Sequence, residues 1–373
     1  MDADAGERPL NRRQNYRELD EDDVRVRPGR GSRPRTRRRP AHADAVGGFV
    51  TAVDRGRYTC LVDGRPVAAM TARELGRKRV VVGDRVALIG DVSGAPDTLA
   101  RIVRVEPRTS VLRRSADDTD PVERVVVANA EQLVVVSSLA DPPPRPRFID
   151  RCLVAAYDAG LRPLLCLTKA DLARPDELLR AYEPLGTTCV VTRKPFTVPA
   201  REGGSPQPPG ALPAPQGGPP QPPDGLDTLR SLLAGQMSVF IGPSGVGKST
   251  LVNALVPTAL RAVAQVNPVT GRGRHTSSSA IALPLAGGGW IIDTPGVRSF
   301  GLGHVTVDRV VRAFPDLQPG TAQCPPHCTH LQPDCALDAW VAAQRSARDR
   351  QRLGARLDSL RRLLHSREAA EDS

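Results

Sequence analysis

The order of two short motifs constrains the fold of this 373-residue chain more than any other feature. The first, Gly242-Pro243-Ser244-Gly245-Val246-Gly247-Lys248-Ser249, matches GxxxxGK[ST], and it stands between the apolar run 238–241 and the helical pattern 250–255. A strand, such a loop and a helix form a phosphate-binding unit, because the glycines let backbone N–H groups surround an anion at the helix N-terminus. The second motif, Thr168-Lys169-Ala170-Asp171, fits [NT]KxD and lies upstream of the first.

The upstream motif indicates which base the site reads. The Asp171 carboxylate can accept hydrogen bonds from N1 and N2 of guanine, whereas adenine offers no such donor pair. The Lys169 stem can cover the base plane, and Thr168 keeps a side chain that forms hydrogen bonds. The expected guanine-contacting residues are Thr168, Lys169, Ala170 and Asp171. Since the phosphate loop comes first in an ordinary small GTPase, the order here predicts a circularly permuted GTPase domain.

A third motif completes the predicted phosphate and magnesium site. Asp293-Thr294-Pro295-Gly296 directly follows the apolar run 290–292 and comes 44 residues after Ser249. We expect Ser249 and Asp293 to bind Mg²⁺, Lys248 to reach the β and γ oxygens during catalysis, and the Gly296 N–H to sense the γ-phosphate. The expected phosphate-contacting residues are Gly242, Pro243, Ser244, Gly245, Val246, Gly247, Lys248, Ser249, Thr250 and Gly296.

Residues 271–279 form a glycine-rich and then hydroxyl-rich segment, as a mobile switch loop requires. Thr276 is the predicted magnesium-sensing and catalytic hydroxyl, with Ser277 and Ser278 as alternatives, although the segment could also be a basic surface loop. Val297 stands where many GTPases have a glutamine that orients water, so slow intrinsic turnover is expected. His275 is the candidate to position the attacking water; alternatively it contacts only RNA or solvent.

The flanking segments predict further domains. Several short strands with turns between residues 46 and 107, including the hairpin signal Asp63-Gly64, indicate a small barrel of the OB type. Such a barrel is either a nucleic-acid platform or a support for its neighbour. From about residue 108 to 300, apolar runs alternate with helical patterns, which predicts a mostly parallel sheet, and a basic helical stretch extends through Arg362.

The N-terminal 45 residues are polar and carry eight arginines and no acidic residue between Val24 and Pro40. They are expected to be a disordered tail, which either is merely solvated or acts as an arm that contacts nucleic-acid phosphates. The net charge of +11 also suggests a polyanionic partner. Residues 197–224 contain ten prolines and predict a surface insertion without a core of its own.

Three cysteines and one histidine crowd into a short C-terminal segment: Cys324, Cys328, His330 and Cys335. Three thiolates and an imidazole satisfy tetrahedral Zn²⁺ with no open position, so the predicted site is structural. His327 is a rival nitrogen ligand. The other cysteines lie scattered in apolar runs, which argues against a disulfide framework.

The order of barrel, base motif, phosphate loop, switch, DTPG and Cys/His segment resembles the RsgA family over roughly residues 46–365. The strings 148–151, 271–276 and 293–300 support the resemblance. It implies a GTPase, with Mg²⁺ as cofactor, that binds GTP and GDP, acts late in maturation of the small ribosomal subunit, contacts its rRNA and is stimulated by it. The expected domains are a tail (1–45), an OB barrel (46–107), the permuted GTPase (108–300) and a zinc module (301–373).

Two other functions remain open from the sequence: an ATP-driven enzyme on nucleic acid, and an RNA-binding assembly factor that holds nucleotide only as a structural ligand. Asp171 argues against the first, and the set Lys248, Ser249 and Asp293 argues against the second. No apolar stretch reaches the ~20 residues of a membrane-spanning helix. We therefore expect a cytoplasmic protein without membrane contact. We also expect it to be a monomer.

Overall fold

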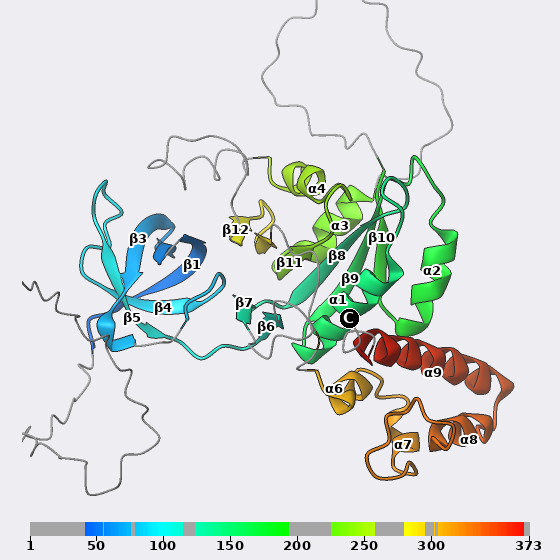
Figure 1. Cartoon of the computed structure of the whole chain (residues 1–373). Coiled ribbons are helices and arrows are strands. Elements are labelled where there is room, and N and C mark those ends of the chain that lie inside the picture. The colour runs from blue at the N-terminus through cyan, green and yellow to red at the C-terminus, as the bar shows by residue number, and fades with distance from the viewer. Residues whose placement is uncertain are drawn as a thin grey trace, which may run out of the picture. The chain divides into compact units, whose positions relative to one another are not determined.

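The computed structural model describes residues 42–54, 56–75, 79–114, 124–193, 225–257, 280–294, 302 and 305–368 (Figure 1). All of these belong to one compact unit, His42–Ser373. Among them, no helix is long and apolar enough to span a bilayer.

The first strands close into a small barrel. They are β1 (Val46–Asp54), β2 (Arg57–Val62), β3 (Arg65–Thr71), β4 (Arg85–Ile89) and β5 (Ala100–Val105), with a 3₁₀ turn, η2, at Arg73–Leu75. The order β1-β2-β3-β5-β4, together with pairing of β1 to β4, closes the sheet on itself. Alternate residues such as Val50, Cys60 and Leu88 point inward and are fully buried. The OB-like barrel expected from the sequence is therefore confirmed.

Two details of the barrel bear on the sequence interpretation. The hairpin at Asp63-Gly64 forms, and both residues adopt positive φ angles of 47° and 78°, which suits this dipeptide. Val80–Val82, however, is not a strand of the barrel. Its residues are buried: Val80 packs in the barrel core, whereas Val82 forms an isolated bridge with Val127 and packs in the core of the GTPase sheet.

The GTPase sheet is parallel through five strands: β8 (Gln132–Ser138), β9 (Arg162–Thr168), β10 (Thr188–Val191), β11 (Met237–Ile241) and β13 (Trp290–Asp293). Their order is β10-β9-β8-β11-β13, and the antiparallel strand β12 (Ile281–Pro284) follows β13. β12 also pairs with β1 of the barrel at Ile281 and Ala52, so one hydrogen-bonded sheet joins the two. A separate hairpin consists of β6 (Val111–Arg114) and β7 (Arg124–Ala128).

Helices cover both faces of this sheet (Figure 1). Leu133 and Val135 of β8 pack in one cluster with helix α1 (Pro146–Asp158). Val134 and Val136 pack in another cluster with α3 (Leu226–Leu233) and α4 (Lys248–Leu255). This alternation explains why β8 reads as a continuous apolar run: a parallel strand covered on both sides is buried at every position.

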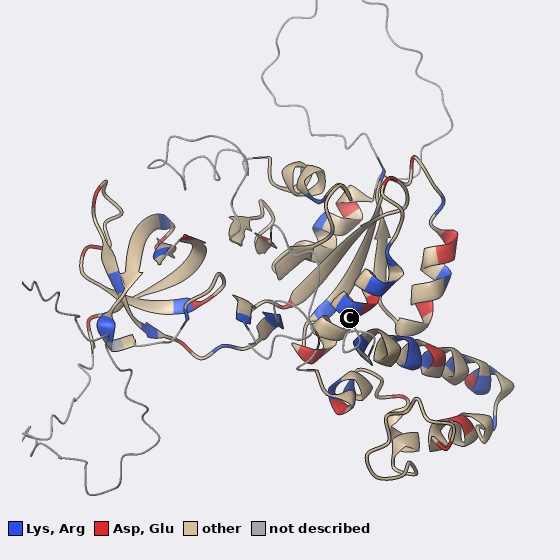
Figure 2. Ribbon diagram, viewed as in Figure 1, with Lys and Arg blue, Asp and Glu red and all other residues tan. Residues whose placement is uncertain are grey.

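The C-terminal part is helical. It contains α6 (Val307–Arg312), α7 (Gln318–Thr321), α8 (Ala336–Ala342) and α9 (Ala347–Glu368). Figure 2 shows that α9 carries many basic side chains. Two of them face the GTPase domain and its junction: the Arg362 guanidinium lies 4.8 Å from the Tyr182 ring centre, and that of Arg356 lies 4.5 Å from the Phe314 ring centre. Tyr182 ends helix α2 (Asp176–Tyr182), which leads into the turn η3 (Glu183–Leu185).

Candidate guanine-nucleotide site and metal centre

The strands of the parallel sheet bring the predicted nucleotide motifs to one edge. β9 ends at Thr168, β11 ends at Ile241 before the phosphate loop, and β13 ends at Asp293. β11 pairs with β13 through Phe240 and Asp293. β8 lies between β9 and β11. Open α/β sheets bind ligands at the carboxyl ends of their strands, so three segments far apart in sequence share one candidate site.

The phosphate loop depends on its glycines. Gly245 and Gly247 adopt φ angles of 83° and 89°, which residues other than glycine rarely adopt. At Gly242, an added Cβ would lie 2.6 Å from the Val136 carbonyl oxygen. Gly247 is the N-cap of α4 and provides no side-chain hydrogen bond, so the N–H groups of the first turn are available to an anion.

Lys248 and Asp293 meet at the sheet edge. The Lys248 ammonium forms an ion pair with Asp293 Oδ1, and the two side chains are only 11% and 22% exposed. The next residue, Thr294, is buried and donates its hydroxyl to the Phe240 carbonyl at 2.8 Å, which anchors the end of β13 to β11. The predicted phosphate-binding lysine and the predicted magnesium-binding acid therefore lie side by side.

The base motif is bonded directly to the phosphate loop. The buried Thr168 donates its hydroxyl to the Val246 carbonyl at 2.6 Å. Lys169 has a left-handed backbone with a φ of 62°, and its ammonium donates to the Asp141 carbonyl. Asp171, the predicted guanine-reading acid, is exposed. The motif thus presents its acid outward while its first residue fixes the neighbouring loop.

Two supporting segments escaped the sequence interpretation. Residues 139–143 follow β8, and the Ser138 hydroxyl donates to the Pro142 carbonyl at 2.7 Å. Pro142 Cδ would lie 3.4 Å from a Cβ added at Gly245, so this segment borders the phosphate loop. The buried Thr192 accepts a hydrogen bond from the Ala170 N–H at 3.1 Å. The topology could have indicated their place in the site, because both segments follow parallel strands of the same sheet.

Several predicted site residues lie outside the described part of the chain. They are His275, Thr276, Ser277, Ser278, Gly296 and Val297. Ser249 and Thr250, by contrast, are described and exposed at the start of α4, next to Lys248.

The four predicted zinc ligands converge. One ligand atom from each of Cys324, Cys328, His330 and Cys335 lies within 4.8 Å of every other. The Cys324 and Cys335 sulfurs are 3.9 Å apart, and His330 Nδ1 is 3.6 Å from each of them. Tetrahedral Zn²⁺ with usual bond lengths requires about 3.8 Å between sulfurs and about 3.6 Å from sulfur to nitrogen. His327 is exposed and is not part of the group.

The surroundings suit a metal centre. Burial lowers the pKa of His330, which keeps its imidazole neutral and able to donate an electron pair. Arg361 of α9 donates to the His330 carbonyl at 3.1 Å and pairs with Asp338 of α8. The long helix thereby clamps the loop that carries the ligands. A closed set of three thiols and one imidazole is chemically a structural and not a catalytic metal site.

These features define a class. A base motif upstream of a phosphate loop, both at the carboxyl edge of one parallel sheet, behind an OB-like barrel and before a Cys/His cluster, is a circularly permuted GTPase.

Comparison with known proteins gives the family. Residues 105–197 and 220–303 match the RsgA GTPase family. A protein of Gemmatimonas aurantiaca called small ribosomal subunit biogenesis GTPase RsgA is 35% identical over 278 residues, which cover 72% of this chain and 80% of that protein. One of the same name from Chlorobaculum parvum is 33% identical over 334 residues, covering 85% and 99% respectively. The chain therefore belongs to the RsgA family and is a GTP-hydrolysing enzyme.

Solved structures agree with the fold. The crystal structure of YjeQ from Thermotoga maritima superposes with a TM-score of 0.55 at 22% identity, covering 87% of this chain and 98% of that one. The structure of YloQ, described as a circularly permuted GTPase, has the same TM-score at 20% identity and covers 89% and 98%.

Proposed function

We propose that this enzyme binds the small ribosomal subunit late in its maturation, hydrolyses GTP to GDP and phosphate there, and is released according to its nucleotide state. The hydrogen bond from Thr168 to the Val246 carbonyl is the observation that carries the nucleotide part, because it couples the base motif to the phosphate loop. The names of the relatives support the ribosomal part.

The residues have distinct roles in this proposal. Lys248, which pairs with the Asp293 carboxylate, would turn to the β and γ oxygens of bound GTP. Asp293, Ser249 and Thr276 would then hold Mg²⁺. Asp171 reads guanine, and the Lys169 stem covers its plane. The bound Mg²⁺ would neutralise charge that develops on the phosphates.

Turnover requires help from the ribosome in this proposal. Val297 cannot orient water, so His275 positions the attacking water when the subunit is bound. His275→Ala should then abolish the stimulation by subunits and leave GTP affinity intact. Full stimulated turnover by this variant would contradict the role.

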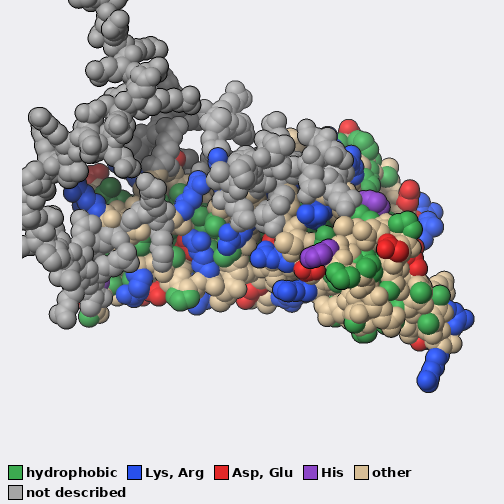
Figure 3. Space-filling view, turned by 60° about the horizontal axis from the view of Figure 1, so that its bottom comes forward, with side chains coloured by type: hydrophobic (Ala, Val, Ile, Leu, Met, Phe, Trp, Pro, Cys, Tyr) green, Lys and Arg blue, Asp and Glu red, His purple; other side chains and the backbone are tan. Residues whose placement is uncertain are grey.

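The barrel, together with the Lys and Arg side chains on the face shown in Figure 3, provides RNA contacts in this proposal. Lys and Arg side chains recur across the face shown in Figure 3, and phosphate neutralisation gives affinity without sequence specificity. We assign residues 46–107 to an RNA-binding domain, 108–300 to the GTPase, 301–373 to a zinc-binding module and 1–45 to a basic tail. We further propose one structural Zn²⁺ in the Cys/His cluster, a monomer, and a cytoplasmic location, where ribosomes mature.

Nucleotide state is proposed to act on the zinc module, since the chain passes from Asp293 into α6 within a short stretch of sequence. Asp293→Asn should uncouple nucleotide state from subunit release. Unchanged release, measured by cosedimentation with GDP and with a non-hydrolysable GTP analogue, would rule this coupling out.

The deciding experiment measures GTP turnover with and without purified small subunits, with ATP in parallel. Strong stimulation specific to GTP supports the proposal. Equal use of ATP would favour an ATPase, and the absence of stimulation would favour an RNA-binding factor that holds nucleotide only as a structural ligand.

A further inference from the structure

A cleft of about 790 Å³ lies where the barrel meets the GTPase domain. Its walls come from β1, β2 and β4 on one side and from the starts of β11 and β13 on the other. The nucleotide site is at the opposite ends of β11 and β13. The cleft is therefore a second concave site, separate from the phosphate loop and from the metal centre.

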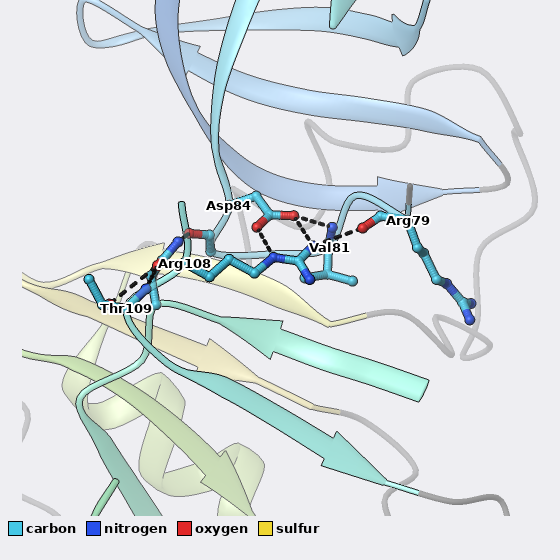
Figure 4. Close-up of polar contacts among 7 residues, drawn as sticks. Arg79, Val81, Asp84, Arg108 and Thr109 are labelled. Atoms are coloured by element: carbon cyan, nitrogen blue, oxygen red, sulfur yellow. Dashed lines mark hydrogen bonds and ion pairs between the residues drawn. The ribbon is translucent and has the colours of Figure 1, made fainter. Parts of the chain in front are cut away.

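A group of polar contacts beside the cleft ties the start of β4 to Arg108, Thr109 and Asn129 (Figure 4). The Asp84 carboxylate is fully buried and accepts two hydrogen bonds from Arg108, at 2.7 and 2.8 Å, and one from the Val81 N–H at 2.8 Å. Asn129 donates to the Gly83 carbonyl and accepts from the Thr109 N–H, both at 2.8 Å. Since these partners satisfy one another, they fix the position of the segments 81–84, 108–109 and 129 beside the cleft.

The barrel wall combines an aromatic ring with a positive charge. Phe49 of β1 is paired across the sheet with Leu61 of β2 on one side and with Arg85 of β4 on the other. Directly paired residues lie on the same face of a sheet, so these three side chains form one strip along the cleft. Arg85 is exposed, and no acidic side chain among the described residues forms an ion pair with it.

The opposite wall carries Trp290. Its ring centre lies 4.9 Å from that of Phe49, with the planes inclined by 44°. Both rings are only half-buried, and both line the cleft. The backbone of Trp290 is fixed by its N–H bond to the Gln236 carbonyl at 2.8 Å. Two aromatic rings that are held in place and line a cavity can stack against a planar ligand.

Two carboxylates also line the cleft. Glu106 is paired with Arg104 at 2.8 Å, and Glu131 accepts the Met237 N–H at 2.8 Å. Each oxygen so used leaves another that can accept from a donor in the cleft. Acceptors beside aromatic rings suit the N–H groups on a nucleobase edge. Arg85, whose carbonyl accepts from the Glu106 N–H on the neighbouring strand, is the cationic lining residue that can take the phosphate.

We propose that this cleft binds one unpaired RNA nucleotide, with the base against Phe49 and Trp290 and its phosphate on Arg85. Stacking on aromatic rings next to a guanidinium is how proteins hold single-stranded nucleic acid, and each stacked base contributes about 1–3 kcal/mol. The inference rests on the proposed function, since it takes RNA as the partner. It places one contact with that RNA in the cleft between the barrel and the GTPase domain, and not on the open surface of either.

Trp290 can report on its own site. The chain has two tryptophans, so Trp340→Phe leaves Trp290 as the sole indole. In this background, a short unstructured RNA oligonucleotide should quench the Trp290 fluorescence and protect it from acrylamide. An abasic oligonucleotide of the same length retains the phosphates and should do neither. Duplex RNA should also fail, because its bases are already paired and stacked.

Two variants and a matched control test the walls. Arg85→Ala should weaken oligonucleotide affinity, and Gly47→Leu should block the cleft, each by about fivefold or more. An added Cβ at Gly47 meets nothing within 4 Å, so the larger side chain can be accommodated by the fold. Arg101→Ala, on an exposed barrel position outside the cleft, should have little effect. Intrinsic GTP turnover should be the same in all of them.

The outcomes separate the two proposals. Equal quenching by the abasic oligonucleotide, or equal loss with Arg101→Ala and Arg85→Ala, would overturn the cleft proposal in favour of general phosphate binding. No response of Trp290 to any RNA would also overturn it and favour a protein ligand. If subunits still stimulate GTP turnover in that case, the proposed function stands without the cleft. If stimulation is absent as well, the partner itself has been misassigned.

Discussion

The nucleotide site and the metal centre are built in opposite ways. The four candidate metal ligands fall within twelve residues, and a few turns bring their atoms together. The nucleotide site gathers Thr168 at the end of β9, the phosphate loop that follows β11, and Asp293 at the end of β13. Local spacing is thus enough for the first, whereas the second requires the whole parallel sheet. Damage to the metal centre should therefore stay local, while damage at the nucleotide edge should affect several segments together.

Loss of the metal should have the largest effect. Cys335→Ser removes a ligand that is only 4% exposed. Since structural zinc contributes roughly 10 kcal/mol or more of apparent binding energy, the helical module should unfold while GTP affinity persists. Zinc content, and denaturation followed at Trp340 of α8, would measure this. Cys189→Ser, outside the cluster, is the control, and a parallel loss of GTP binding would show that the two regions are not independent.

Lys248→Ala should weaken GTP binding about 10- to 100-fold, because a charge-assisted contact contributes about 1.5–3 kcal/mol. The variant also leaves Asp293 without its ion-pair partner. Isothermal titration with GTP measures the change. Arg180→Ala, at an exposed position of α2 outside the nucleotide motifs, serves as the control. Similar losses in the two variants would mean that Lys248 has no special role at the phosphates.

Thr168→Val should lower GTP affinity about 2- to 10-fold by removing one hydrogen bond, normally about 0.5–1.5 kcal/mol. The Val246 carbonyl loses its partner, so the phosphate loop should become more mobile, which hydrogen exchange of its amides can detect. Thr168→Ser keeps the hydroxyl and should behave like the parent. If the serine variant fails equally, packing of the methyl group and not the bond connects the motifs.

The smallest expected effect concerns the contact between α1 of the GTPase domain and α9 of the C-terminal module. Asp150 of α1 is 2% exposed and faces Arg362 of α9, with Oδ1 and Nε 3.3 Å apart. The two atoms do not form a hydrogen bond. Burial therefore outweighs the attraction of Arg362 and raises the pKa of the Asp150 carboxyl. Above that raised pKa, the ionised group costs folding free energy.

Asp150→Asn should consequently stabilise the protein at neutral pH, which would raise the urea concentration at the midpoint of unfolding. In the parent protein, the stabilising contribution of the protonated Asp150 is fully present below its pKa in the unfolded chain and is lost as pH rises through its pKa in the folded protein. The difference in unfolding free energy between variant and parent should therefore vanish in acid. Urea denaturation at several pH values measures it. Asp349→Asn, exposed on α9, should show no such dependence. Destabilisation by Asp150→Asn at neutral pH would mean that the ion pair dominates.

Particular elements show how far the sequence could lead. The phosphate loop, the barrel and the C-terminal helices follow from local patterns of glycine, alternating apolar residues and helical periodicity. The pattern of short strands between residues 46 and 107 does not distinguish Val80–Val82 from the barrel strands, because an apolar run does not reveal its partner; Val82 pairs with Val127 of β7. The segment after β8 and the role of Thr192 depend on which strands become neighbours. Periodicity along the chain carries no such information.

The pairing of β12 with β1 has a practical consequence for dissecting this protein. A fragment that starts after the barrel would uncover the outer side of β12 and the apolar surface of Trp290. An unpaired strand edge beside exposed aromatic surface is a template for intermolecular sheet formation. Expressed alone, the GTPase domain should therefore aggregate. In the intact chain, the barrel prevents this by pairing with β12.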